Sequence, residues 1–289
     1  MIKRTLTFFV CFLIFSSILS QQTIEGTVVD SSTNQPLPYV NVGIHNKNIG
    51  TVSAEDGAFK LGLNSSFKES DTIVFSYIGY DTHKTIFGNL KSSDNKVLLK
   101  PTEHLINEVV IQPRKMTGKT FGRKSKGLGL MHWNFYSAKE KDVDDRLSKE
   151  IGMSFKMRDT CRLQTFHFAI STNEFKSLKF RINIYNVKDD QPDSLIISDN
   201  IIFHLKDQVT GWQSVDLKPY NIYLNEIKEE MLVSIQWVES EKARGESKYF
   251  AIPASTSPLH KIFYRDKAMD EWKSQNGNLS MYLDAKCIL

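Results

Sequence analysis

Apolar and polar residues alternate along much of the chain after residue 22, and short turn-forming stretches interrupt the alternation. A period of two is typical of strands that bury one face, whereas an amphipathic helix repeats every three to four residues. In the N-terminal third, the pattern predicts strands around Ile24 and at 27–29, 39–44, 59–63, 72–77 and 96–99. About seven short strands at this spacing predict a compact β-sandwich.

The alternation returns after residue 150 and is stronger there. Phe166, Phe168 and Ile170 alternate with Thr165, His167 and Ala169, and the same beat runs from Leu178 to Ile184. Further strands are predicted at 201–205, 212–217, 231–238, 248–252, 260–264 and 278–284. One apolar face per strand predicts two stacked antiparallel sheets, and the lack of helical repeats argues against a parallel βαβ architecture. The predicted fold class is therefore all-β.

The first twenty residues change the expected location of the protein. Lys3 and Arg4 precede an apolar run from Leu6 to Leu19, and small and polar residues follow at Ser20 and Gln21. This order predicts a secretory signal peptide at 1–20; the competing interpretation, a membrane anchor, would need a run of about 20 apolar residues. No second run of spanning length follows, so the mature chain is expected to be exported and to lack a membrane span.

The net charge of the chain makes one class of binding partner less suitable, and the cysteines leave one question open. Removing Lys3 and Arg4 leaves 35 of the 37 basic residues against 33 acidic ones. A nearly neutral chain is a poor candidate for nucleic acid, whose phosphates require a net basic surface. Only Cys161 and Cys287 follow the predicted cleavage point, and the sequence leaves open whether they form a disulfide or stay buried as free thiols.

Several motifs in the first sandwich occur in a recognisable order: 26–30 (GTVVD), 36–42 (PLPYVNV), 55–59 (EDGAF) and 76–80 (SYIGY). This set resembles the carboxypeptidase regulatory-like domain, a transthyretin-like seven-stranded sandwich, and implies such a domain at 22–111. Residues 105–111 also resemble the strand that follows this domain in outer-membrane TonB-dependent receptors of the Bacteroidota. A plug and a barrel of many hundreds of residues follow in those receptors, so a transporter is not expected from 289 residues.

Residues 112–126 are predicted to be a basic linker, with six Lys and Arg residues and no acidic one. A solvated hinge and a contact with an anionic partner such as lipopolysaccharide are both open interpretations. The remainder, 127–289, is predicted to be a larger jelly-roll-like sandwich. Residues 211–217 and 231–238 resemble the later strands of galactose-binding-like jelly rolls, which implies an architecture and, more weakly, a ligand class.

A search for catalytic chemistry finds no local motif. The seven histidines lie singly without a second ligand at helical spacing, so no zinc peptidase site and no other metal site is expected. There is no Gly-x-Ser-x-Gly turn and no nucleotide-binding loop, and no cofactor is expected. A glycan-active hydrolase with a nonlocal pair of carboxylates remains the alternative hypothesis. The chain is predicted not to be an enzyme.

Aromatic residues on the polar parity of a strand are candidates for ligand binding. Trp237 has the parity of Met231, Val233 and Ile235, so it is expected in the core. Trp212, Tyr185 and Tyr282 instead have the parity of polar neighbours. If they share one sheet surface, they form a stacking platform for a sugar or peptide; otherwise they pack under loops or against the first domain.

These observations predict an exported, non-catalytic binding or structural protein of the cell envelope that recognises a glycan or a protein partner. The first domain would be a spacer or docking module, and the second would carry the ligand surface. The resemblance to receptor domains favours the periplasm or the periplasmic side of the outer membrane over free secretion.

Overall fold

The computed structural model describes residues 22–102, 115–127, 130–138, 140–157, 159–224 and 230–288. Over these residues the chain forms β-strands and short 3₁₀ turns, with no α-helix, so the all-β prediction is confirmed. No helix among them is long and apolar enough to cross a membrane. The expected signal peptide at 1–20 and the strand expected at 105–111 lie outside the described residues.

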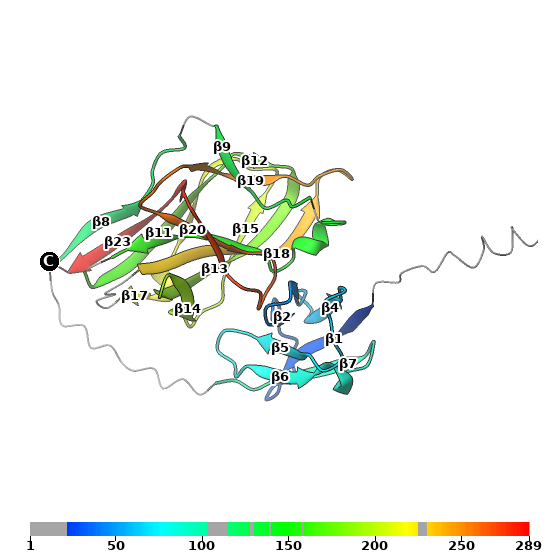
Figure 1. Ribbon diagram of the computed structural model, residues 1–289. Coiled ribbons are helices and arrows are strands. Elements are labelled where there is room, and N and C mark those ends of the chain that lie inside the picture. The colour runs from blue at the N-terminus through cyan, green and yellow to red at the C-terminus, as the bar shows by residue number, and fades with distance from the viewer. Residues whose placement is uncertain are drawn as a thin grey trace, which may run out of the picture.

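The N-terminal strands form a sandwich of two sheets (Figure 1). One has the order β4-β1-β7 and the other the order β3-β2-β5-β6. Their bounds are β1 Thr23–Asp30, β2 Asn41–Ile44, β3 Ile49–Val52, β4 Ala58–Gly62, β5 Thr72–Ser76, β6 His83–Ile86 and β7 Asn95–Leu99, with the 3₁₀ helix η1 at Phe87–Asn89. The seven strands that the resemblance implies are present. Buried apolar side chains such as Val28, Leu61 and Phe75 fill the space between the sheets.

A larger β-structure follows. Its main sheet has the order β14-β13-β18-β10-β20-β21, with β15 on β13. These strands are β10 Glu150–Lys156, β13 Phe175–Lys188, β14 Gln191–Leu195, β15 Ile201–Lys206, β18 Glu230–Lys242, β20 Lys261–Arg265 and β21 Lys273–Asn276. The opposing sheet, β16-β11-β23-β8 with β17 on β11, comprises β8 Met116–Gly122, β11 Cys161–Ile170, β16 Gly211–Asp216, β17 Tyr223–Leu224 and β23 Met281–Ile288.

A small third sheet has the order β12-β19-β22, with β9 on β19. It comprises β9 Met131–Asn134, β12 Thr172–Asn173, β19 Phe250–Ser255 and β22 Asn278–Leu279; the 3₁₀ helices η2 Val143–Arg146 and η3 Lys218–Tyr220 lie in the connections. The short mixed-charge stretch at 142–150 thus forms one helical turn before β10 begins. Asp142 caps this turn, because its carboxylate accepts from the Val143 amide at 2.6 Å.

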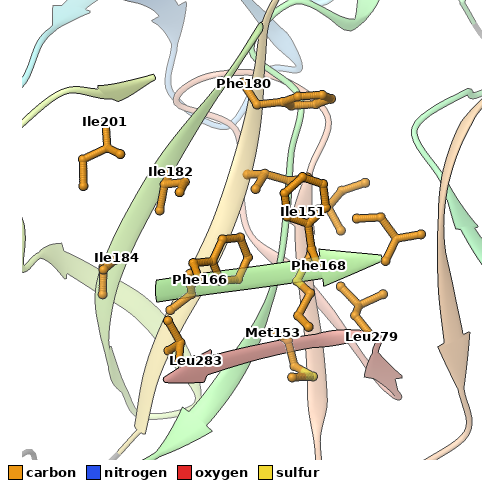
Figure 2. Close-up of a cluster of buried hydrophobic side chains, with 14 of the residues drawn as sticks. Ile151, Met153, Phe166, Phe168, Phe180, Ile182, Ile184, Ile201, Leu279 and Leu283 are labelled. Carbon is orange, nitrogen blue, oxygen red and sulfur yellow. The ribbon is translucent and has the colours of Figure 1, made fainter. Parts of the chain in front are cut away.

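The main core lies where the two larger sheets face each other (Figure 2). Phe166 and Phe168 of β11 meet Ile182 of β13 and Ile151 of β10, and all four are 0% exposed. Each such side chain contributes about 1.5–3 kcal/mol on burial, so this layer is the principal stabilising element of the fold. Trp237 is also 0% exposed, which confirms its expected place in the core.

The basic segment after residue 114 is not a linker in the structure. Residues Met116–Gly122 form β8, which pairs with β23 from Met116↔Ile288 to Gly122↔Tyr282. Lys119, counted as linker charge, forms a 2.5 Å salt bridge with Asp159. The linker prediction is therefore wrong for these residues, because lysine and glycine at an edge strand hid the alternation. Residues 112–114 lie outside the described part, and the remaining domain boundaries stay predictions.

Cys161 and Cys287 form a disulfide, which settles the question that the sequence left open. Cys161 begins β11 and Cys287 lies near the end of β23, at a directly paired register position. Both residues are 0% exposed. The bond joins neighbouring strands 126 residues apart in the sequence.

The outer face of the main sheet is covered by the first sandwich. Arg181 of β13, 1% exposed, donates hydrogen bonds to the Tyr39 carbonyl and to Gln236 Oε1, the latter at 3.0 Å. Gln236 Nε2 in turn donates to Asn41 Oδ1 of β2 at 2.9 Å. Tyr39, Val52 and Val238 form a buried apolar contact beside these bonds.

The connection from β20 to β21 completes this contact. A Cβ on Gly43 or Gly50, which face each other on β2 and β3, would lie 2.5 or 2.7 Å from the carbonyl oxygen of Ala268. Only glycine permits this approach. The two sandwiches are therefore packed closely on one face of the main sheet. Considering the described residues alone, the outer face of the opposing sheet stays open, with half-buried and exposed side chains such as Trp212, Tyr282 and Ser214.

Candidate functional site

Two of the three predicted platform aromatics come together on this open face. Trp212 of β16 and Tyr282 of β23 lie on either side of β11, with ring centroids 5.1 Å apart and an interplanar angle of 67°. The β11 residue directly opposite Trp212 is Ala169, whose small side chain leaves room for the indole to reach across the strand. Both aromatic side chains are half-buried, so part of each ring faces solvent.

Tyr185 does not join them. It lies on β13 in the other sheet and is 7% exposed. Its hydroxyl accepts from Arg265 Nη2 at 3.1 Å and donates to Glu150 Oε2 at 3.4 Å, and its ring packs edge-on against Trp272 at 5.5 Å. Burial raises the pKa of Tyr185, and the nearby Glu150 carboxylate raises it further. Of the two alternatives that the sequence left open, Tyr185 follows the second: it packs under a loop, because the β20–β21 connection covers its side of the sheet.

A polar row crosses all four strands beside the aromatic pair. Gly122, Tyr282, His167 and Ser214 are register partners on β8, β23, β11 and β16. The His167 ring stacks on Tyr282 with centroids 4.2 Å apart and an angle of 9°. Its Nδ1 lies 2.7 Å from Ser214 Oγ. Its Nε2 lies 3.1 Å from Asp284 Oδ2, so both ring nitrogens are engaged.

Asp284 extends this row to the edge strand. Thr120 of β8 donates to Asp284 Oδ1 at 2.6 Å, while Oδ2 faces His167. Burial lowers the pKa of His167 and outweighs the opposite effect of the Asp284 charge, so the imidazole keeps its neutral form to lower pH than usual. The row fixes the orientation of His167, and through stacking it fixes the Tyr282 ring.

Sequence reasoning missed this row because its members are far apart. His167 lies 47 residues from Ser214 and 117 from Asp284, so no local spacing connects them. The sequence offered one indication of the row, which is strand parity: His167, Ser214 and Asp284 all occupy the polar positions of predicted strands. Which strands lie side by side could not be obtained from parity alone.

Ser214, His167 and Asp284 have the residue types of a hydrolytic triad but not its surroundings. Acyl transfer requires two donors aimed at the developing oxyanion. Ser214 projects from the face of a sheet, whereas the N–H groups of its strand lie in the sheet plane. No pair of these amides converges above its hydroxyl. The row is better suited to holding rings in place than to nucleophilic attack.

A cleft of about 1740 Å³ between the sandwiches holds the carboxylates that bear on the hydrolase hypothesis. Glu140 and Asp266 approach each other there, since Lys149 Nζ lies 3.4 Å from one carboxylate and 3.3 Å from the other. Arg146 donates two further bonds to Glu140, at 2.7 and 3.1 Å.

Burial would raise the pKa of Asp266, but the hydrogen bond from Lys273 and the charge of Lys149 lower it. Hydrolysis by two carboxylates requires one of them to stay protonated, and the lowered pKa of Asp266 makes that residue unsuited to the role. Among the residues that the structure describes, no group of three His, Cys, Asp or Glu side chains could hold a metal ion.

The comparison with protein families decides the nature of the N-terminal part. The family model of the CarboxypepD_reg-like domain matches residues 24–111. The described residues of this stretch are therefore similar to a carboxypeptidase regulatory-like domain. Its seven strands in two sheets are those described above for the first sandwich.

A curated relative extends this similarity. The chain is 32% identical over 127 residues to the TonB-dependent receptor SusC of Bacteroides thetaiotaomicron, which involves 40% of this chain and 12% of the receptor. The chain therefore spans about an eighth of that relative. What the receptor does as a whole does not carry over to this chain through such a match.

Solved structures give only distant similarities. The cysteine protease and lectin-like domains of Cwp84, a surface-layer-associated protein of Clostridium difficile, align over 86% of this chain and 58% of theirs, with 10% identity and a TM-score of 0.38. A proposed carbohydrate-binding protein from Bacteroides uniformis aligns over 90% of this chain and 98% of its own, with 9% identity and a TM-score of 0.22. These scores carry no argument about function.

Proposed function

We propose that this chain is an exported protein of the cell envelope that binds a glycan noncovalently, on the open face of the β16-β11-β23-β8 sheet. The observation that carries the proposal is the half-buried pair of Trp212 and Tyr282, in contact across β11, with His167 stacked on Tyr282. A sugar ring presents apolar C–H faces and a rim of hydroxyls, so it needs an aromatic surface with polar groups beside it.

The open face favours a glycan over a protein partner. The groups that reach solvent on this face include two half-buried rings and, beside them, Ser214, Asp284 and Thr120, which can exchange hydrogen bonds with hydroxyls. A stable protein interface would need about 800 Å² per partner with a more apolar centre. We infer from the closely packed contact at Arg181 that the carboxypeptidase regulatory-like domain acts as a rigid spacer or docking module.

The envelope location rests on two supports. The N-terminal sequence has the order of a signal peptide, and part of the chain is similar to SusC, a TonB-dependent receptor. The periplasm and the outer membrane are the compartments that these supports favour, and free secretion is the alternative. Signal-peptide processing in a Bacteroides host, followed by fractionation, would test this location.

The binding proposal is tested with Trp212→Ala and the matched control Tyr223→Ala. Tyr223 is a half-buried aromatic on β17, at the opposite end of the same sheet. A panel of neutral and acidic oligosaccharides, measured by calorimetry, is expected to contain a ligand whose affinity falls at least tenfold in Trp212→Ala and stays within twofold in the control. Equal loss in both variants, or no ligand in the panel, contradicts the proposal.

The hydrolase alternative predicts product release instead of binding. Incubation of the same panel with the protein, followed by chromatography, would show shortened chains that disappear in Glu140→Gln or Asp266→Asn. Because both carboxylates are paired with cations, we expect no such products.

A further inference from the structure

Two lysines that form no salt bridge with a described residue flank the aromatic pair. The Lys124 ammonium lies over the Tyr282 ring, 5.2 Å from its centroid. Lys126 Nζ lies 3.6 Å from the position that a Cβ on Gly211 would occupy, next to Trp212 in the chain. Both lysines are exposed, and over the described part of the chain neither forms a salt bridge.

The segment that carries these lysines is fixed to the sheet. The Arg123 amide donates to the Met281 carbonyl at 2.7 Å, and the Arg123 guanidinium donates to the Asn278 carbonyl at 2.9 Å. The Ser280 hydroxyl donates to the Ser125 carbonyl at 2.9 Å. The backbone of residues 123–125 is thus held beside β22 and the first residue of β23, and the two ammonium groups lie beside the rings on flexible side chains.

The face also carries two carboxylates on the other side of the aromatic pair. Asp284, Thr165 and Asp216 are register partners on β23, β11 and β16, one pleat beyond the row of Tyr282, His167 and Ser214. The Asp284 side chain is 42% exposed and engaged by Thr120 and His167. The carboxylates and the two lysines therefore lie on opposite sides of the aromatic pair, and Arg162 and Lys286 add positive charge beyond the carboxylates.

This order selects one kind of occupant. A ring stacked on Trp212 or Tyr282 would place substituents on one side toward the lysines and on the other toward carboxylates. Lysine ammonium groups bind anionic oxygens most strongly, and carboxylates accept hydrogen bonds from hydroxyls. A neutral sugar would leave both ammonium groups unpaired, whereas an acidic sugar uses every part of the face.

We propose that the ligand is an acidic oligosaccharide, one whose rings carry carboxylate or sulfate groups that pair with Lys124 and Lys126. The inference rests on the proposed function, because it names the ligand class of the same face. The aromatic pair supplies the stacking contact, and the two lysines select the charged sugar over its neutral form.

The probes are oligogalacturonates, the same oligomers with methyl-esterified carboxylates, and sulfated galactan oligomers. They are titrated into the full mature chain, the double variant K124Q/K126Q and the control K96Q/K100Q. The control removes the same charge from exposed positions at β7. Thermal melting of each variant confirms that it is folded.

We expect at least one acidic probe to bind the wild type tenfold or more tightly than the methyl ester. That preference should fall to within threefold in K124Q/K126Q, remain in K96Q/K100Q, and weaken as NaCl is raised from 50 to 500 mM, since salt screens exposed charges. The difference between carboxylated and sulfated probes then identifies the anion.

Two failures are distinguishable. If the methyl ester binds as tightly as both acidic probes and Trp212→Ala abolishes its binding, the acidic ligand class is wrong but the binding face stands. If no probe responds to Trp212→Ala, the proposed function fails as well. An equal loss in both lysine variants would show a general charge effect and would also overturn the inference.

Discussion

At the scale of single residues, the two sheets of the larger structure differ in what happens to the side chains that point away from the core. On β13 the polar positions Arg181, Asn183 and Tyr185 are at most 7% exposed, because the first sandwich and the β20–β21 connection cover them. On β11 and β23 the equivalent positions His167 and Tyr282 reach solvent. Parity correctly separates core side chains such as Trp237 from the rest, but it does not report what lies beyond the sheet.

Arg181 provides the sharpest stability prediction. Arg181→Met keeps most of the side-chain length but removes the donors to the Tyr39 carbonyl, Asn200 and Gln236. Leaving these buried acceptors unpaired is expected to lower the free energy of unfolding by about 3 kcal/mol. Urea denaturation measures it, with Lys188→Met at the exposed end of the same strand as the control. Equal midpoints for the two variants would contradict the prediction.

His167 provides a pH prediction at the proposed site. Its pKa is lowered by burial, so its neutral form is favoured in the folded protein, and stability declines as pH falls below about 6.5, where the unfolded imidazole takes up its proton. Asp284 opposes this shift, so Asp284→Asn should lower the pKa of His167 further. An NMR titration of the imidazole measures the pKa of His167 in the wild type and in Asp284→Asn, with Asp216→Asn as the control. A rise in the pKa with Asp284→Asn would contradict the placement of the charge.

At the scale of elements, long strands with clear alternation are predictable, and short edge strands are not. The predicted strands at 178–184, 201–205 and 231–238 lie within β13, β15 and β18. Two short edge strands, β3 and β8, lack the alternation of apolar and polar residues. β3 contains Gly50, and β8 has three lysine or glycine positions among seven residues. The pairing of His167 with Ser214 and Tyr282 depends on the order of strands in the sheet, and short-range sequence patterns do not show which strands are neighbours.

The disulfide between β11 and β23 provides the element-scale prediction. In the chain-entropy model a bond between residues so far apart stabilises the fold by about 4–5 kcal/mol, so Cys161→Ala with Cys287→Ala should lower the free energy of unfolding by an amount of that order. Guanidinium denaturation measures the change. Because Cys161 and Cys287 are both fully buried, dithiothreitol should leave the disulfide of the native wild-type protein intact. Rapid reduction of the native protein would contradict this arrangement.

At the scale of the whole molecule, the contact between the two sandwiches is tight and partly polar. Besides Arg181, it uses the close approach of Ala268 to Gly43 and Gly50, and a hydrogen bond of 3.1 Å from the Asn46 amide to the Met269 carbonyl. Lys179 adds bonds to Glu55 at 2.9 Å and to the Tyr39 hydroxyl at 3.0 Å. We expect the two sandwiches to tumble and unfold together.

Gly43→Val tests this expectation. Its Cβ would overlap the Ala268 carbonyl, so the contact should open, with a loss of about 1–3 kcal/mol and a larger radius of gyration in small-angle X-ray scattering. Gly88→Val is the control, because nothing lies within 4 Å of a Cβ at Gly88. An unchanged radius in Gly43→Val, with the strand content retained by circular dichroism, would show that the contact does not hold the two parts together.

The position of β23 has a consequence for the order in which the molecule is made. This strand lies between β11 and β8, yet it comes after both of them, and after every other strand described here, in the direction of synthesis. On the ribosome, β8 and β11 therefore emerge without the neighbour that joins them. The glycan-binding face proposed above can be assembled only after translation has passed residue 288, so a nascent chain released before that point would expose two unpaired strand edges to aggregation.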